Sequence, residues 1–204
     1  MFFELGEGAE GEYIGLDPVL SSSFQTELIG SNTMAIYNRT ILSRNQYFPG
    51  MLINASQIHF MAAEYYLKAG QDAQAKEHYE SGVRESIHYY DILRDMSNNL
   101  ISPEPMPITE AGIDTYLADA DISWDAATGH MEKMRLIAEQ KWLHFNVVQP
   151  NENWAELRRI EMPDLVFWED QSNQQSLPPA GGFILVQSKP TIRKITSRYR
   201  PMTI

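Results

Sequence analysis

The stretch "AAEYYLKAGQDAQAKEHYESGVRESIHYY", residues 62–90, decides the fold. Just before it, Asn54 and Gln57 have the spacing of a capping box, which predicts the start of a helix. Gly70 predicts the end of this helix, and Asp72 predicts the cap of a second one. Because the loop between them is so short, we expect the two helices to pack antiparallel as a hairpin.

Apolar residues recur at three- and four-residue steps along both predicted helices, which indicates an apolar stripe on each. The stripe of the first helix is Ile58, Met61, Ala62, Tyr65 and Ala69, and that of the second is Ala75, Tyr79, Gly82, Val83, Ile87 and Tyr90. The order of small and aromatic residues resembles a tetratricopeptide repeat: Ala63, Tyr66, Gly70, Ala75, Tyr79 and Gly82. No second copy follows at a period of about 34 residues, so the hairpin must pack on other helices.

The strongest helix pattern of the chain lies before Pro150. Its predicted apolar side is Met131, Met134, Ala138, Trp142 and Phe145, and its predicted polar side is Glu132, Lys133, Arg135, Glu139 and Lys141. Arg135 and Glu139 are spaced to form an ion pair. Pro150 predicts the end of this helix, and Asn151 or Asn153 predicts the cap of a short helix through "WAELRR".

The stretch "QKWLHFNVVQPNENWAELRR", residues 140–159, joins these two helices and carries two tryptophans. Trp142, Trp154 and Leu157 continue the apolar pattern, which favours core packing over a platform for a ligand. The arginines near the helix end are expected to pair with nearby carboxylates or with free carbonyls; the side chains concerned are Arg158, Arg159, Glu152 and Glu156.

The remaining segments predict little regular structure. Residues 1–50 are rich in glycine, serine and asparagine and are predicted to be irregular, and a short helix is expected after Thr109. Beyond Pro163, the one convincing strand is "GFILVQ", residues 182–187. We therefore expect a mainly α fold, with a tetratricopeptide-like hairpin packed against further helices, long irregular loops and little β. Residues 1–204 are expected to form a single domain.

The composition narrows the class of function. The chain has 16 lysines and arginines against 27 acidic residues, and this net charge of −11 disfavours nucleic acid and anionic lipid as partners. The absence of cysteine excludes disulfides, thiolate metal sites and a lipidated cysteine in this chain. No apolar run approaches the roughly 20 residues of a membrane helix, and the first residues lack the pattern of a secretory signal.

Motifs for catalysis or cofactor binding are weak. The glycines of "GEGAEG", residues 6–11, match a dinucleotide pattern, but no apolar strand precedes them and Glu7 and Glu10 would repel a pyrophosphate. No two histidines have the helical spacing of a zinc site, so we predict neither a metal nor a cofactor; they are His59, His78, His88, His130 and His144. The carboxylates lie mostly on polar helix faces, which disfavours a glycosidase pair.

Two ordered motifs carry a resemblance to a known family. "IAEQKWLHFN" followed by "NENWAELRRIEMPDL" is similar to the signature near the C-terminus of SusD/RagB-family proteins; the matching residues are Gln140, Lys141, Trp142, Glu152, Trp154, Arg158, Arg159 and Pro163. An earlier family element, Tyr-x-x-Gly-[IV]-Arg-x-Ser, is matched by Tyr79, Gly82, Val83, Arg84 and Ser86. Together the motifs cover about residues 51–165.

The resemblance implies a non-enzymatic, glycan- or starch-binding lipoprotein on the outer membrane of Bacteroidetes. It implies two partners: an oligosaccharide or polysaccharide, and a SusC-like TonB-dependent transporter to which the glycan is delivered for nutrient uptake. Family members are usually more than twice as long and start with a signal peptide and a lipidated cysteine. This chain, which has neither, is therefore expected to be the C-terminal portion of a longer protein.

Aromatic side chains in loops are the candidates for stacking against sugar rings. We single out Tyr116, Trp124 and Trp168 as predicted glycan-binding residues, and no family binding residue maps onto a matched motif position. Trp124 lies between helices beside two aspartates, where it either stacks on a sugar or anchors its loop on the core. The alternative function is a tetratricopeptide-like adaptor for protein interactions; a glycoside hydrolase is a third, less favoured hypothesis.

Overall fold

The computed structural model describes residues 3–9, 11, 13–15, 17, 20–97 and 108–164. These residues divide into two compact units. The described part of the first unit comprises residues 3–4, 35–97 and 108–164, and that of the second lies within residues 5–34. The single domain expected for residues 1–204 stays a prediction. The predicted strand at residues 182–187 lies outside the described residues.

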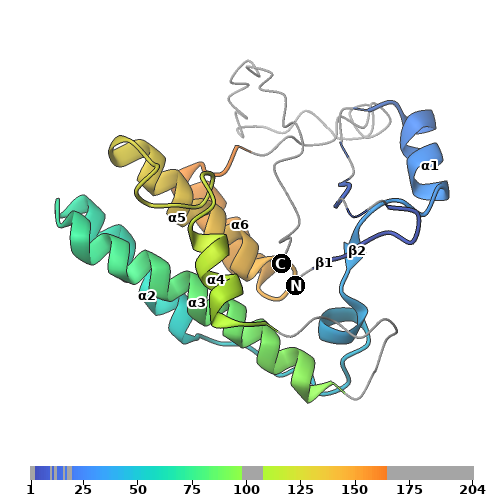
Figure 1. The fold of residues 1–204 in the computed structure, drawn as a ribbon, viewed down its shortest axis with the longest axis horizontal. Coiled ribbons are helices and arrows are strands. Elements are labelled where there is room, and N and C mark those ends of the chain that lie inside the picture. Colours follow the sequence, from blue (N-terminus) through green and yellow to red (C-terminus); the bar gives the residue numbers. More distant parts are fainter. Residues whose placement is uncertain are drawn as a thin grey trace, which may run out of the picture. The chain divides into compact units, whose positions relative to one another are not determined.

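The predicted helical hairpin is present as α2 (Ala55–Lys68) and α3 (Asp72–Met96), which lie side by side in Figure 1. The predicted capping box starts α2: the Asn54 side chain accepts from the Gln57 backbone N–H at 3.0 Å, and the Gln57 side chain accepts from the Asn54 N–H at 2.9 Å. Gly70 makes the turn with φ +72°, a conformation that glycine adopts without strain. Asp72 is the first residue of α3 and not its cap, because Gln71 occupies the cap position.

The buried face of α2 is not the predicted apolar stripe. Ile58, Met61 and Tyr65 are 49%, 50% and 67% exposed. The face that packs on the other helices belongs to Phe60 and its neighbours three, four and seven residues on, Ala63, Glu64 and Leu67. Both stripes have helical periodicity, so contacts from outside the helix choose between them. The prediction was wrong on this point.

The predicted stripe of α3 is confirmed, because Ala75, Tyr79, Gly82, Val83 and Tyr90 are buried. Gly82 lets the two helices approach closely: a Cβ at this position would lie 2.7 Å from the Phe60 ring. The hydroxyl of Ser56 donates to the Gly82 carbonyl at 2.8 Å, which adds a polar contact at the same crossing. The hairpin seam is therefore built from small residues against an aromatic ring.

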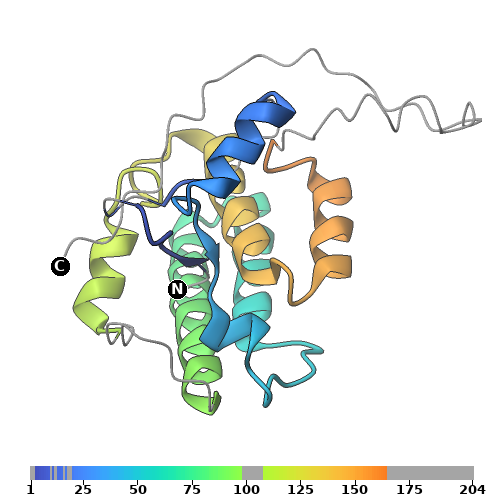
Figure 2. The same cartoon turned by 90° about the vertical axis from the view of Figure 1, so that its right-hand side faces the viewer.

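Three further helices pack with the hairpin: α4 (Glu110–Leu117), α5 (Gly129–Phe145) and α6 (Pro150–Ile160). The predicted helix after Thr109 is present, and Thr109 caps it, since its hydroxyl accepts from the Gly112 N–H at 3.1 Å. Figure 2 shows α5 alongside α2, with α6 on the outer side of α5. Pro150 is the first residue of α6, so the predicted caps Asn151 and Asn153 lie inside that helix.

The interface between α2, α3 and α5 holds the main apolar cluster of the first unit. Its buried members are Phe60, Ala63, Leu67, Ala75, Tyr79, Val83, Trp124, Met134, Leu136 and Ile137. A smaller cluster of Ile41, Tyr90 and Leu93 lies toward the other end of α3. On α5, Met134, Ala138 and Phe145 are buried as predicted, whereas Met131 is exposed.

Residues 1–50 contain more regular structure than predicted. In the first unit, β1 (Phe3–Glu4) pairs antiparallel with β2 (Ile36–Tyr37), and a π-helix follows at Arg39–Ser43. In the second unit, α1 (Ser22–Gly30) begins at a cap made by Ser21. The described chain is mainly α with little β, which confirms the predicted fold class. In the described ranges, no helix has the length and apolar character needed to cross a bilayer.

Candidate functional site

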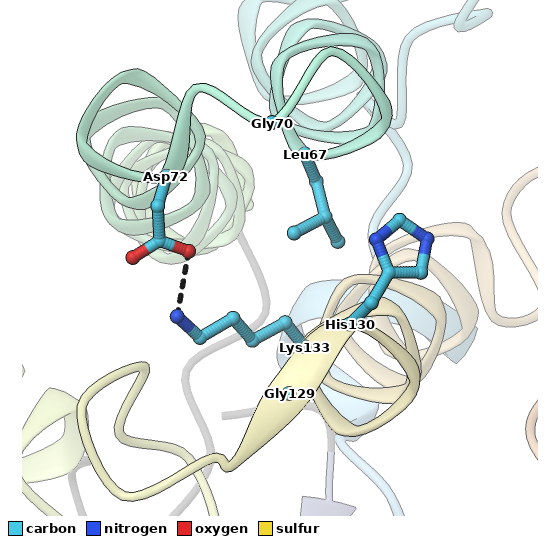
Figure 3. A pocket seen from close by; sticks show the side chains of 6 residues that line it. All are labelled: Leu67, Gly70, Asp72, Gly129, His130 and Lys133. Atoms are coloured by element: carbon cyan, nitrogen blue, oxygen red, sulfur yellow. Dashed lines mark hydrogen bonds and ion pairs between the residues drawn. The ribbon is translucent and has the colours of Figure 1, made fainter.

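A shallow pocket of about 240 Å³ opens beside the α2–α3 turn, where the first residues of α5 approach it. Leu67, Gly70, Asp72, Gly129, His130 and Lys133 line it. We call this set of six residues the turn pocket. Figure 3 shows the Leu67 side chain between the Asp72–Lys133 pair on one side and His130 on the other. The pocket thus combines one apolar side chain with a carboxylate, an ammonium group and an imidazole.

Two glycines shape the turn pocket. Gly70 follows the end of α2 and Gly129 begins α5, and both have positive φ, +72° and +84°. A Cβ at either position would meet open space, so backbone conformation and not crowding favours glycine here.

Asp72 and Lys133 form the charged wall of the pocket. The Lys133 Nζ lies 2.6 Å from Asp72 Oδ1, and the hydrogen bond from Lys133 lowers the pKa of the Asp72 carboxyl below its ordinary value. Lys133 also lies over the ring of Trp124, 5.1 Å from its centroid, and the Trp124 indole N–H donates to Asp72 Oδ2 at 3.5 Å. Trp124 therefore contacts both residues of the charged wall.

Trp124 itself anchors its loop on the core. It is 2% exposed and its ring centroid lies 5.3 Å from that of Tyr79. Tyr79 donates its hydroxyl to the Ile122 carbonyl at 2.7 Å, which fixes the same loop. In this conformation the buried indole contacts the charged wall of the turn pocket and exposes no ring face on which a sugar could stack. Direct stacking of a glycan on Trp124 stays a prediction that requires the loop to move.

The other two predicted glycan-binding residues do not line the turn pocket. Tyr116 is half-buried, and its hydroxyl accepts from the Gln140 side chain at 2.9 Å. Trp168 lies outside the described residues. The sequence predicted no binding role for the pocket residues Asp72, His130 and Lys133. The glycines that precede Asp72 and His130 were the available signal, but glycine turns are common at helix ends and indicate no ligand.

The stretch 140–159 forms a structural seam, and charge holds it together. Lys141 on α5 lies 3.0 Å from Glu64 on α2 and 2.9 Å from Glu156 on α6. Arg159 reaches the same two carboxylates, with a bidentate contact to Glu64 in which both distances are 2.6 Å. The pairing of Arg159 with Glu156 was predicted; the contact with Glu64 was not. We call Glu64, Lys141, Glu156 and Arg159 the seam cluster.

The seam cluster keeps its acids ionised. Burial disfavours the charged form of Glu64, but hydrogen bonds from Arg159 and Lys68 and the charge of Lys141 outweigh it and hold its pKa far below the ordinary value. The pKa of Glu156 is lowered by the same balance, with Arg159 and Lys141 offsetting burial. Conversely, the two carboxylates raise the pKa of Arg159. The arrangement is that of a satisfied ion-pair network, in which the removal of one partner would leave a buried charge uncompensated.

Core packing was the wrong prediction for Trp154, which is 56% exposed. Glu156 and Arg159 face α2 and α5, and Trp154 lies two residues from Glu156, about 200° around the helix. The rotation of α6 therefore turns Glu156 and Arg159, and not Trp154, toward the other helices. Trp142 is half-buried on α5. The predicted ion pair of Arg135 with Glu139 is confirmed, at 2.5 Å.

Residues 2–180 match the family SusD-like_2, described as starch-binding and associating with the outer membrane. A solved structure described as a SusD-like protein of Bacteroidetes (AC2a) is similar in fold, with a TM-score of 0.53 and 21% sequence identity. The match covers 75% of this chain but only 30% of that one. No curated protein matches the chain at a significant level.

Proposed function

Because the chain belongs to the SusD-like_2 family, we propose that it binds a glycan at the outer membrane and hands it to a SusC-like, TonB-dependent transporter. The family match over residues 2–180 is the observation that carries the proposal. The net charge of −11 fits a neutral polyol better than an anionic ligand, since a field of this sign repels anions. In this role the protein is a binding protein and not an enzyme.

We place one sugar unit in the turn pocket. Its volume of about 240 Å³ is below the roughly 300–1,000 Å³ of sites for larger ligands, which suits a single ring or chain end. Asp72 offers acceptors, Lys133 and His130 offer donors, and the largely buried Leu67 adds an apolar side chain to the lining. The pocket is open, so the rest of a longer oligosaccharide can extend into solvent.

The first experiment measures glycan binding directly. We expect retarded migration of the full chain in native gels containing one polysaccharide of a panel that includes starch, and a calorimetric signal with the corresponding oligosaccharides. The absence of retardation and of heat with every glycan in the panel would contradict glycan binding by this chain. Co-purification with the transporter is a separate measurement, because glycan binding and delivery can fail independently.

A second experiment locates the site. His130→Ala and Lys133→Met remove two pocket donors and are expected to weaken binding of the glycan found above by about tenfold each, since a good hydrogen bond to a ligand is worth roughly 1–1.5 kcal/mol. The control is His88→Ala, because His88 lies on α3 and pairs with Glu110, outside the pocket. Unchanged affinity in both pocket variants would move the site elsewhere while leaving the function intact.

A further inference from the structure

The hairpin brings together two histidines that lie nineteen residues apart. His59 on α2 and His78 on α3 face each other with a distance of 3.0 Å between their Nδ1 atoms. Both side chains are half-buried, so the pair is reachable from solvent. The sequence predicted no metal-binding pair among the histidines, because helical spacing reveals pairs on one helix but not pairs across a hairpin.

The surroundings of the pair fix the orientation of one ring. Tyr66 stacks on His78 with 5.2 Å between ring centroids and 7° between their planes. The rings of His59 and His78 have centroids 5.2 Å apart and an interplanar angle of 40°. Each histidine lies within a regular helix, and the close packing of α2 on α3 holds the two Cα atoms in place. The backbone positions of the pair are thus preorganised.

A short contact between two Nδ1 atoms has a definite chemical meaning. As a hydrogen bond, it requires one ring to donate its Nδ1 proton and the other to accept with a lone pair. If the donor ring takes the other neutral tautomer, with its proton on Nε2, both lone pairs face the same gap. Two neutral imidazole nitrogens that face one gap are a bidentate ligand for a metal ion.

We propose that His59 and His78 form a bidentate site for a divalent transition-metal ion, with Cu²⁺ as the preferred ion. Two nitrogens bound at about 2.0–2.1 Å, with an angle at the ion between square and tetrahedral, lie about 2.8–3.4 Å apart. The observed 3.0 Å falls within this range, so the rings need to rotate but the helices need not move.

The number of ligands selects the ion. Within the described ranges, no group of three or more His, Cys, Asp or Glu residues is placed to hold a metal, so two imidazoles and water complete the shell. Zinc sites in proteins use three or four protein ligands, which this pair does not supply. Cu²⁺ accepts a tetragonal shell of nitrogen and oxygen donors and stands at the top of the affinity order for divalent first-row ions.

The test is a titration of the full chain with CuSO₄ in a buffer that does not chelate copper, followed by calorimetry and by electron paramagnetic resonance. We expect one equivalent to bind with a spectrum that shows nitrogen ligation. His59→Ala and His78→Ala should each lower the association constant by about a hundredfold, because the second ligand of a chelate acts at high effective concentration. His88→Ala is the matched control, since it removes a histidine of α3 outside the pair and should leave binding unchanged.

Thermal unfolding provides a second readout that does not depend on the spectrum. Saturating Cu²⁺ should raise the Tm of the wild-type chain and of His88→Ala, and should not raise that of His59→Ala or His78→Ala. Circular dichroism without copper verifies that each variant is folded. Absence of one-equivalent binding by the wild type, or equal affinity in all three variants, would show that the histidines form a hydrogen-bonded pair only.

Discussion

The Lys141 ammonium on α5 lies 3.0 Å from the Glu64 carboxylate on α2, and the two side chains are only 3% and 8% exposed. This buried pair joins two helices through residues that lie 77 positions apart in the sequence. Arg159 from α6 completes the contact on the other side of Glu64. Lys141 and Arg159, two residues of the motif in the stretch 140–159, therefore connect α5 and α6 to α2 through Glu64.

We predict that Lys141→Met lowers the free energy of unfolding by about 3–5 kcal/mol, because it leaves two carboxylates with less compensation in a buried position. Lys68→Met is the matched control. Lys68 contacts the same Glu64 at 2.6 Å, but its side chain is 54% exposed, and the expected loss is below about 1 kcal/mol. Urea denaturation checks both values. Equal losses in the two variants would show that burial of the pair does not matter.

Gly82→Ala should destabilise the chain by about 1–3 kcal/mol, because the added methyl group would lie 2.7 Å from the Phe60 ring in a packed seam. Gly30→Ala is the control, since a Cβ at Gly30 meets nothing within 4 Å and alanine has the higher helix propensity. Thermal unfolding compares the two. Combining Gly82→Ala with Phe60→Leu should recover part of the loss, whereas simple addition of the two losses would contradict a steric cause.

The tryptophans differ in role, and truncation should separate them. Trp124→Ala is expected to cost about 3–5 kcal/mol, because a buried ring is lost from the main apolar cluster. Trp154→Ala should cost less than about 1 kcal/mol, because its ring is largely exposed. Chemical denaturation gives both values. A large loss for Trp154→Ala would mean that its face is covered in solution.

The stability of the chain should fall as the pH drops below 7, and His144 is the predicted cause. Burial lowers its pKa from 6.5 to about 4, and its ring nitrogens contact Ser86 at 2.8 Å and Asn54 at 2.7 Å. The unfolded chain therefore binds more protons between these two pH values, so stability is full above about pH 6.5 and is lost as the pH falls toward 4. The shift corresponds to roughly 3 kcal/mol.

The measurement is the free energy of unfolding as a function of pH between 7 and 4.5. His144→Gln should flatten this dependence, because glutamine keeps polar contacts but does not titrate. His88→Ala should leave the slope unchanged. Below about pH 4.5 the curve should steepen again as Glu64 loses the stabilisation that its lowered pKa provides. An identical slope for His144→Gln and the wild type would exclude His144 as the titrating group.

Much of the scaffold was predictable from local patterns. The capping box at Asn54, the turn at Gly70, the buried stripe of α3 and the start of α4 at Thr109 all depend on residues close in sequence. Such features follow from hydrogen bonding at helix ends and from helical periodicity. The candidate site was not predictable in the same way, because Asp72 and Lys133 of the turn pocket are 61 residues apart.

The sequence by itself determined where the hairpin lies and that the described chain is mainly helical, since caps, glycine turns and apolar periodicity act within a few residues. Only the tertiary structure decided which face of α2 is buried, how α6 is rotated and which histidines meet. On α2, the stripe with Glu64 can be buried because Lys141 and Arg159, 77 and 95 residues away, pair with its carboxylate. A charge can be buried only where its partners are, and the partners come from distant parts of the chain.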